Sequence, residues 1–120
     1  MPRAARLVLA AILVVFGLNG MLGFIPLPPP PAAAQAFRQA LVDSGYMLPL
    51  WKGIEFLGAG LLLAGTWVPF ALVILTPVLV NIFLFHLFLA PGGLSLALLM
   101  LGLTTYLAWH HRAAYRTLFT

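Results

Sequence analysis

The chain has 120 residues, of which 63% are hydrophobic and only 7% are charged, and its net charge is +4. A typical soluble domain is about 45–50% apolar and about 25% charged, and a domain of this size cannot bury so much apolar surface within itself. The composition therefore excludes an ordinary water-soluble fold and predicts lipid around most side chains. The absence of cysteine excludes disulfides, thiolate metal sites and cysteine nucleophiles.

Residues 7–25 form the first predicted span. This run carries no charged side chain and is close to the ~20 residues that cross a bilayer as a helix. A secretory signal peptide is the alternative, because the chain has a basic start and an Ala-x-Ala motif at residues 34–36. The apolar run is longer than the ~7–15 residues usual in signal peptides and ends well before that motif, which favours the span.

Residues 26–45 predict an outer loop that contains a short surface helix. The proline-rich residues 26–31 cannot continue a helix, because proline lacks an amide N–H and clashes with the preceding turn. We expect a stiff, extended exit from the membrane there. Residues 32–44 then place apolar side chains at helical spacing, which indicates a short amphipathic helix. Ser44 and Gly45 are expected to close it.

Three further spans are predicted, at residues 46–67, 69–90 and 94–110. Tyr46, Trp51 and Trp67 are aromatic anchors of the kind found at membrane interfaces. Pro77 is expected to kink the third span, and a tight turn at residues 91–93 precedes the fourth. We therefore predict an all-α fold, a four-transmembrane-helix bundle forming one integral membrane domain over residues 1–120.

The positive charges predict the orientation and exclude one class of partner. Arg3, Arg6, Arg112 and Arg116, at the two chain ends, supply four of the six Lys and Arg residues. They form no basic stripe with interleaved aromatic residues, so nucleic acid is not indicated as a partner. An even number of spans places both termini on one side, and the excess of arginine makes that side the cytoplasm.

Five strongly polar residues lie inside the predicted spans, namely Asn19, Lys52, Glu55, Asn81 and His86. A charged side chain at a helix centre costs roughly 2.5–3.5 kcal/mol on insertion scales. At about 1.5 Å per residue, all five fall in the half of the membrane away from the termini. We expect one polar cluster there, with Glu55 and His86 handling protons, Lys52 paired with Glu55, and the two asparagines orienting them.

A purely structural role is the alternative for these residues. Lys52 and Glu55 would then fix the helix register as an ion pair. Asn81 would bond carbonyls loosened by Pro77, and His86 would bond across helices.

Motifs that indicate a particular enzyme class or cofactor are missing. The sequence has no P-loop, no GxGxxG, no GxSxG and no HExxH. His110 and His111 point about 100° apart on a helix, so they do not form a metal site alone. The residues themselves therefore indicate no metal and no cofactor.

Three short segments carry a family resemblance: residues 16–20 (FGLNG) with Phe24, residues 52–58 (KGIEFLG) and residues 81–86 (NIFLFH). With them the chain resembles the DoxX family of small four-helix bacterial membrane proteins. The resemblance implies a bacterial plasma (inner) membrane protein that is a component of an oxidoreductase system, with quinone as its ligand class. Where many relatives carry a histidine near the end of the first span, this chain has Gly23.

Three functional hypotheses follow. The first is an accessory component that binds a small apolar or quinone-like molecule, or a partner membrane or redox subunit, beside Glu55, Asn81 and His86. The second is a structural or assembly subunit without a ligand, in which the polar residues only lock the helices. The third is a small transporter, which requires a homo-oligomer because four spans make a poor pore for one chain.

Overall fold

The computed structural model describes residues 2–22 and 31–118, and this part of the chain consists of helices and the turns between them. The four long helices are α1 (Pro2–Leu22), α3 (Met47–Ala64), α4 (Val68–Phe88) and α5 (Leu94–His110). The short helix α2 (Ala32–Asp43) lies between the first two, and the 3-10 helices are η1 (Pro91–Gly93) and η2 (Arg112–Leu118). The predicted all-α fold of four long apolar helices with a short helix between the first and second is confirmed.

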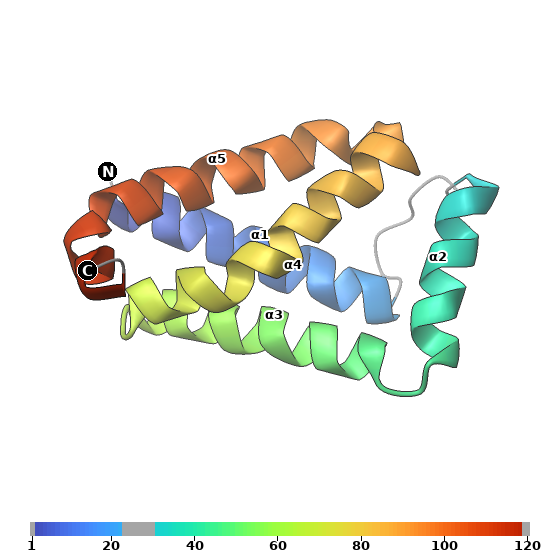
Figure 1. Ribbon diagram of the computed structural model, residues 1–120, viewed down its shortest axis with the longest axis horizontal. Helices are drawn as coiled ribbons and strands as arrows, with labels where there is room; N and C mark the ends of the chain where they lie inside the picture. The colour runs from blue at the N-terminus through green and yellow to red at the C-terminus, as the bar shows by residue number, and fades with distance from the viewer. Residues whose placement is uncertain (1, 23–30, 119–120) are drawn as a thin grey trace.

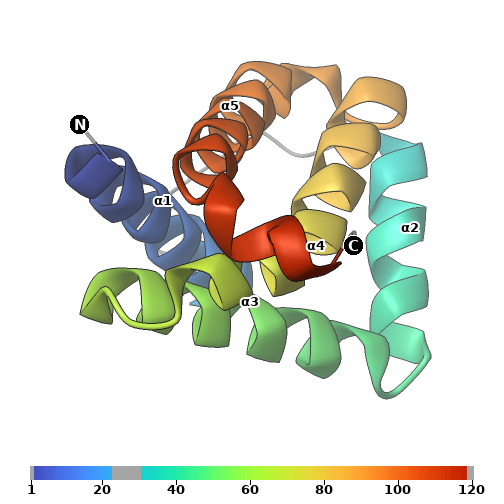
Figure 2. The ribbon, with the colours of Figure 1, turned by 60° about the vertical axis from the view of Figure 1, so that its left-hand side comes forward.

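The four long helices form a ring in which α1 packs against α3 and α5, while α4 packs against α3 and α5 from the other side. Successive long helices run in opposite directions (Figure 1). The start of α1 and the helix η2 lie at one end of the bundle, which we call the terminal end, whereas α2 and η1 lie at the other, the loop end (Figures 1 and 2). An even number of antiparallel helices explains why the start of α1 and the helix η2 lie at the same end.

Most residues of the long helices are not fully buried inside the bundle. All four are long and apolar enough to cross a membrane, and only 22–33% of each candidate span is buried inside the bundle. Leu57, Phe70 and Leu98, for example, are 54%, 48% and 51% exposed. Large contiguous apolar surfaces of this kind need a lipid surrounding, so the chain is a multi-pass membrane protein.

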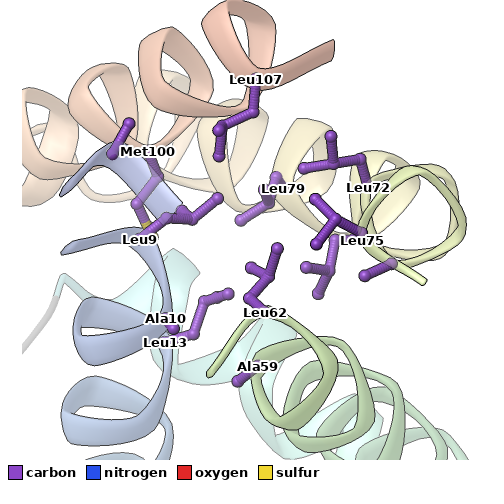
Figure 3. Packing of buried hydrophobic residues seen from close by; sticks show 13 residues of the cluster. Leu9, Ala10, Leu13, Ala59, Leu62, Leu72, Leu75, Leu79, Met100 and Leu107 are labelled. Carbon is purple, nitrogen blue, oxygen red and sulfur yellow. The ribbon is translucent and has the colours of Figure 1, made fainter. Parts of the chain in front are cut away.

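The core consists of leucine, alanine, valine and methionine side chains that all four long helices contribute (Figure 3). Leu9, Leu62, Leu75 and Leu107, one from each helix, are completely buried. Gly58 allows α3 to approach α4 closely, because a Cβ atom at Gly58 would lie 2.5 Å from Cγ of Leu75. Small residues have this function at many helix contacts in membranes. Helix α1 thus packs into the core with the other three long helices.

The turn between α3 and α4 begins earlier than the predicted span 46–67 implied. Gly65 adopts a left-handed conformation with φ 74°, and its amide N–H donates to the carbonyl of Leu61 at 2.9 Å. The N–H of Thr66 donates to the same carbonyl at 3.3 Å. A left-handed glycine that captures the last carbonyls is a common helix stop. The helix therefore ends at Ala64, and Trp67 belongs to the turn.

The junction between α2 and α3 depends on Ser44. Its hydroxyl donates to the carbonyl of Leu41 at 2.7 Å and accepts the N–H of Met47 at 3.0 Å, so it serves the end of one helix and the start of the next. The predicted closure of the surface helix at Ser44 and Gly45 is confirmed, with φ 81° at Gly45.

Helix α2 covers the loop end of the bundle. The ring of Phe37 packs against that of Phe85 in α4, with a centroid distance of 5.6 Å, and Ala34 is buried. Gly23, Phe24 and most of the predicted proline-rich exit, residues 26–30, lie outside the described residues.

Candidate functional site

An ion pair lies inside the second long apolar helix. Nζ of Lys52 is 3.4 Å from Oε2 of Glu55, one turn further along α3. The side chain of Glu55 is only 5% exposed and that of Lys52 17%. A buried carboxylate is costly unless a cation lies beside it, and Lys52 is that neighbour of Glu55. The predicted pairing of these two residues is confirmed.

Helix α1 closes over the carboxylate of Glu55. A Cβ atom at Gly17 would lie 3.2 Å from Oε2 of Glu55 and 3.1 Å from the ring of Phe56, so the missing side chain leaves room for both. Asn19, two residues further along α1, is also buried, at 7% exposed. The contact between α1 and α3 therefore encloses the carboxylate of Glu55.

Asn81 lies in a different place, in an open groove between α3 and α4. This groove has a volume of about 160 Å³, and its lining is Met47, Leu50, Trp51, Ile54, Pro77, Val78 and Asn81. Apart from the indole N–H of Trp51, the amide of Asn81 is the polar group in an apolar lining. An apolar cavity of about 150 Å³ is large enough to hold benzene. The groove therefore has room for one six-membered ring.

His86 occupies a third place, at the corner where α4 meets η1. Its Nδ1 lies 2.9 Å from the carbonyl of Ile82 in the same helix. The imidazole packs edge-on against Phe85, at a centroid distance of 5.2 Å, and covers Gly93, where a Cβ atom would collide with it. Within the described ranges, no hydrogen bond or ion pair joins His86 to Glu55.

The five predicted polar residues thus share the loop-end half of the bundle, and the four on α3 and α4 occupy three positions around it. Lys52 and Glu55 lie at the α1–α3 contact, Asn81 in the α3–α4 groove, and His86 at the corner at η1. Asn19 is buried on α1. Proton exchange between Glu55 and His86 stays a prediction.

Arg6 makes a structural contact that the sequence did not predict. From the sequence, Arg6 indicated only the orientation of the chain in the membrane. Nη1 of Arg6 donates to the carbonyl of Leu62 at 2.9 Å, near the end of α3, and the guanidinium packs against Gly65. A cation near the last carbonyls of a helix stabilises its negative end. Because 56 residues separate Arg6 from Leu62, no local sequence pattern could reveal the contact.

No protein-family model matches the chain, and comparisons with curated proteins and with solved structures find no match either.

Proposed function

We propose that this protein is an accessory component of a membrane oxidoreductase system and binds a quinone-like ring in the groove between α3 and α4. The observation that carries the proposal is the composition of that groove, which combines apolar walls and the volume of one ring with the amide of Asn81. Pockets for small molecules are typically apolar with a few polar groups that fix orientation. The amide N–H of Asn81 can donate to a quinone carbonyl, while Trp51 and Pro77 contact the ring faces.

The role proposed is binding and presentation of the ring rather than electron transfer by this chain. The chain has no thiol to carry electrons. Its buried carboxylate, Glu55, is held by Lys52 against α1, on a different contact from the groove. A partner membrane or redox subunit would then perform the redox step. The DoxX-like segments support this assignment and a bacterial plasma membrane location.

Fluorescence of Trp51 offers a direct test, because Trp51 lines the groove. The chain has three tryptophans, so the Trp67→Phe/Trp109→Phe background leaves Trp51 as the reporter. In nanodiscs of neutral lipid, a short-chain alkyl benzoquinone should quench this emission saturably. Asn81→Leu should weaken the apparent affinity about tenfold, the effect of one hydrogen bond of about 1.4 kcal/mol.

Thr105→Val is the matched control, because Thr105 is an exposed polar residue on α5 that bonds the carbonyl of Leu101 in its own helix. It should leave the quenching curve unchanged. Quenching that rises linearly with quinone concentration would show that the quinone only partitions into lipid. Equal quenching curves for Asn81→Leu and the control would likewise refute a specific site.

A structural or assembly subunit is the second candidate, and the Lys52–Glu55 pair favours it. The carboxylate is confined between a lysine of its own helix and the backbone of α1 at Gly17. That arrangement fixes the register of α3 against α1 without needing a ligand.

A further inference from the structure

A second cavity opens at the terminal end of the bundle, far along the helices from the α3–α4 groove. Its volume is about 370 Å³, and α1 lines it with Arg3 and Arg6, while the end of α5 lines it with His110 and His111. Gly65, from the turn between α3 and α4, and Val68, the first residue of α4, form another part of the wall. Among the described residues, no carboxylate belongs to this lining.

The position of Arg6 is fixed by the fold. The guanidinium donates one N–H to the carbonyl of Leu62 at 2.9 Å and rests on Gly65, whose missing side chain leaves it room. An arginine has five N–H donors in a planar arrangement. A ligand in the cavity can therefore use the donors that Leu62 does not engage, on a side chain that is already held in place.

The charges around the cavity share one sign. His110 and His111 lie edge to face with a centroid distance of 4.9 Å, and burial, together with the charge of His110, lowers the pKa of His111. Arg112 follows them, with its guanidinium 4.2 Å from the ring centre of Trp109. The two acidic residues of the chain, Asp43 and Glu55, lie on α2 and within the Lys52 ion pair. A lowered pKa disfavours the charged form of His111, so the arginines supply the positive charge at the terminal end. A bound anion would reduce the repulsion among them.

We propose that this cavity binds a phosphate group, and that the anionic headgroup of a membrane phospholipid supplies it. Guanidinium groups recognise phosphate through paired N–H donors, and basic pockets between membrane helices are known to hold anionic lipid headgroups. Trp67 and Trp109 are 73% and 63% exposed beside the same end of the bundle. Exposed tryptophans mark the headgroup level of a bilayer, which puts the cavity where such phosphates lie. The site is independent of the proposed quinone groove.

Native mass spectrometry of the full chain tests the proposal. The protein is released from nanodiscs containing equal amounts of phosphatidylglycerol and phosphatidylcholine, and the lipids that stay bound are counted. Phosphatidylglycerol should be retained in preference. Arg3→Gln should reduce that preference about tenfold, as expected for one charge-assisted hydrogen bond, and His110→Gln should reduce it in the same direction.

Arg116→Gln is the matched control, because Arg116 is exposed on η2 at the same end but does not line the cavity. It removes the same charge and should preserve the preference. Arg3 and His110 are themselves exposed, so both variants should fold, and their thermal midpoints in phosphatidylcholine nanodiscs check this. Equal losses in Arg3→Gln and Arg116→Gln, or no preference in the unmodified chain, would overturn the proposal in favour of a diffuse basic surface.

A second arm identifies the source of the phosphate. The thermal midpoint of the unmodified chain is measured in phosphatidylcholine nanodiscs with added inorganic phosphate, and in nanodiscs containing phosphatidylglycerol. If the midpoint rises with phosphatidylglycerol alone, the site binds a lipid headgroup. If it rises equally with inorganic phosphate, the site binds the free ion and the assignment to lipid is wrong. If neither raises the midpoint, the cavity is not a phosphate site.

Discussion

Glu55 is the residue on which the structural candidate depends most. Its carboxylate is 5% exposed, pairs with Lys52 at 3.4 Å and fits against Gly17. The sequence predicted the lysine partner because two residues three apart on a helix face each other. It could not predict that α1 reaches the carboxylate at a glycine, because that contact depends on how two distant helices are rotated.

The variant Glu55→Gln tests how much the ion pair with Lys52 contributes to stability. This change keeps the shape of the side chain but leaves Lys52 without its counter-charge. Thermal unfolding in detergent should show a loss of about 1–3 kcal/mol, less than the ~3–5 kcal/mol for breaking a fully buried pair. The loss is smaller because the flexible lysine can extend toward the interface.

The double variant Lys52→Met/Glu55→Gln is the control, since it removes both charges and should recover part of the lost stability. Failure to recover would mean that the charge pair is not what stabilises this contact. If Glu55→Gln instead unfolds normally but no longer supports the activity of its redox partner, Glu55 handles protons and is not a structural residue.

His86 shows the limit of residue-level prediction. Its depth along α4 was correctly expected to lie near the loop end, because rise per residue is constant in a helix. Its neighbours were not predictable, because they depend on the η1 turn that places Gly93 under the imidazole. Depth alone placed Glu55, Asn81 and His86 at similar levels, and the structure separates them around the bundle.

At the scale of elements, the long apolar runs predicted all four long helices, and the fourth has the predicted bounds, Leu94–His110. The error at the end of α3 has a specific cause. No charged residue interrupts the sequence between Ala64 and Trp67, so the length of the uncharged run overestimated the helix. Gly65 was the available stop signal, and it ends the helix through a left-handed backbone. The N-terminal helix begins at Pro2, because proline suits the first turn and the next residues favour helix.

The contact between α3 and α4 gives the second prediction. Gly58→Ala would place a Cβ atom 2.5 Å from Cγ of Leu75, a completely buried side chain. The two helices would have to separate, so we expect a loss of about 1–3 kcal/mol in stability, typical of overpacking. Thermal unfolding in a fixed detergent measures the change.

Gly60→Ala is the control for this contact. A Cβ atom at Gly60 would meet no atom within 4 Å, and alanine favours helix more than glycine does. The variant should therefore unfold at the same temperature as the unmodified chain or slightly above it. Equal destabilisation by both variants would show that glycine is needed for backbone reasons and not for the approach of α4.

At the scale of the whole molecule, composition alone predicted the membrane environment, because so small a fold cannot hide so many apolar residues. The even number of spans, with arginines near both chain ends, also predicted that the arginines gather at one end of the bundle. It did not predict that they line a cavity there, since the arginines come from α1 and the histidines from the end of α5, more than 100 residues later in the chain.

The orientation of the bundle is the last prediction. The arginines at the terminal end should hold it in the cytoplasm, with α2 on the opposite side. The chain contains no cysteine, so a single cysteine reports one site. Ala36→Cys on α2 should react with a membrane-impermeant maleimide in intact cells, whereas Ala113→Cys on η2 should react only after the cells are opened.

Both alanines are exposed, so labelling depends on sidedness and not on access within the fold. The unmodified chain supplies the background, since it has no thiol to label. Reaction of Ala113→Cys in intact cells would place the arginine-rich end outside. The cationic cavity would then face away from the cytoplasm, and the anionic lipid proposed for it would have to come from the outer leaflet.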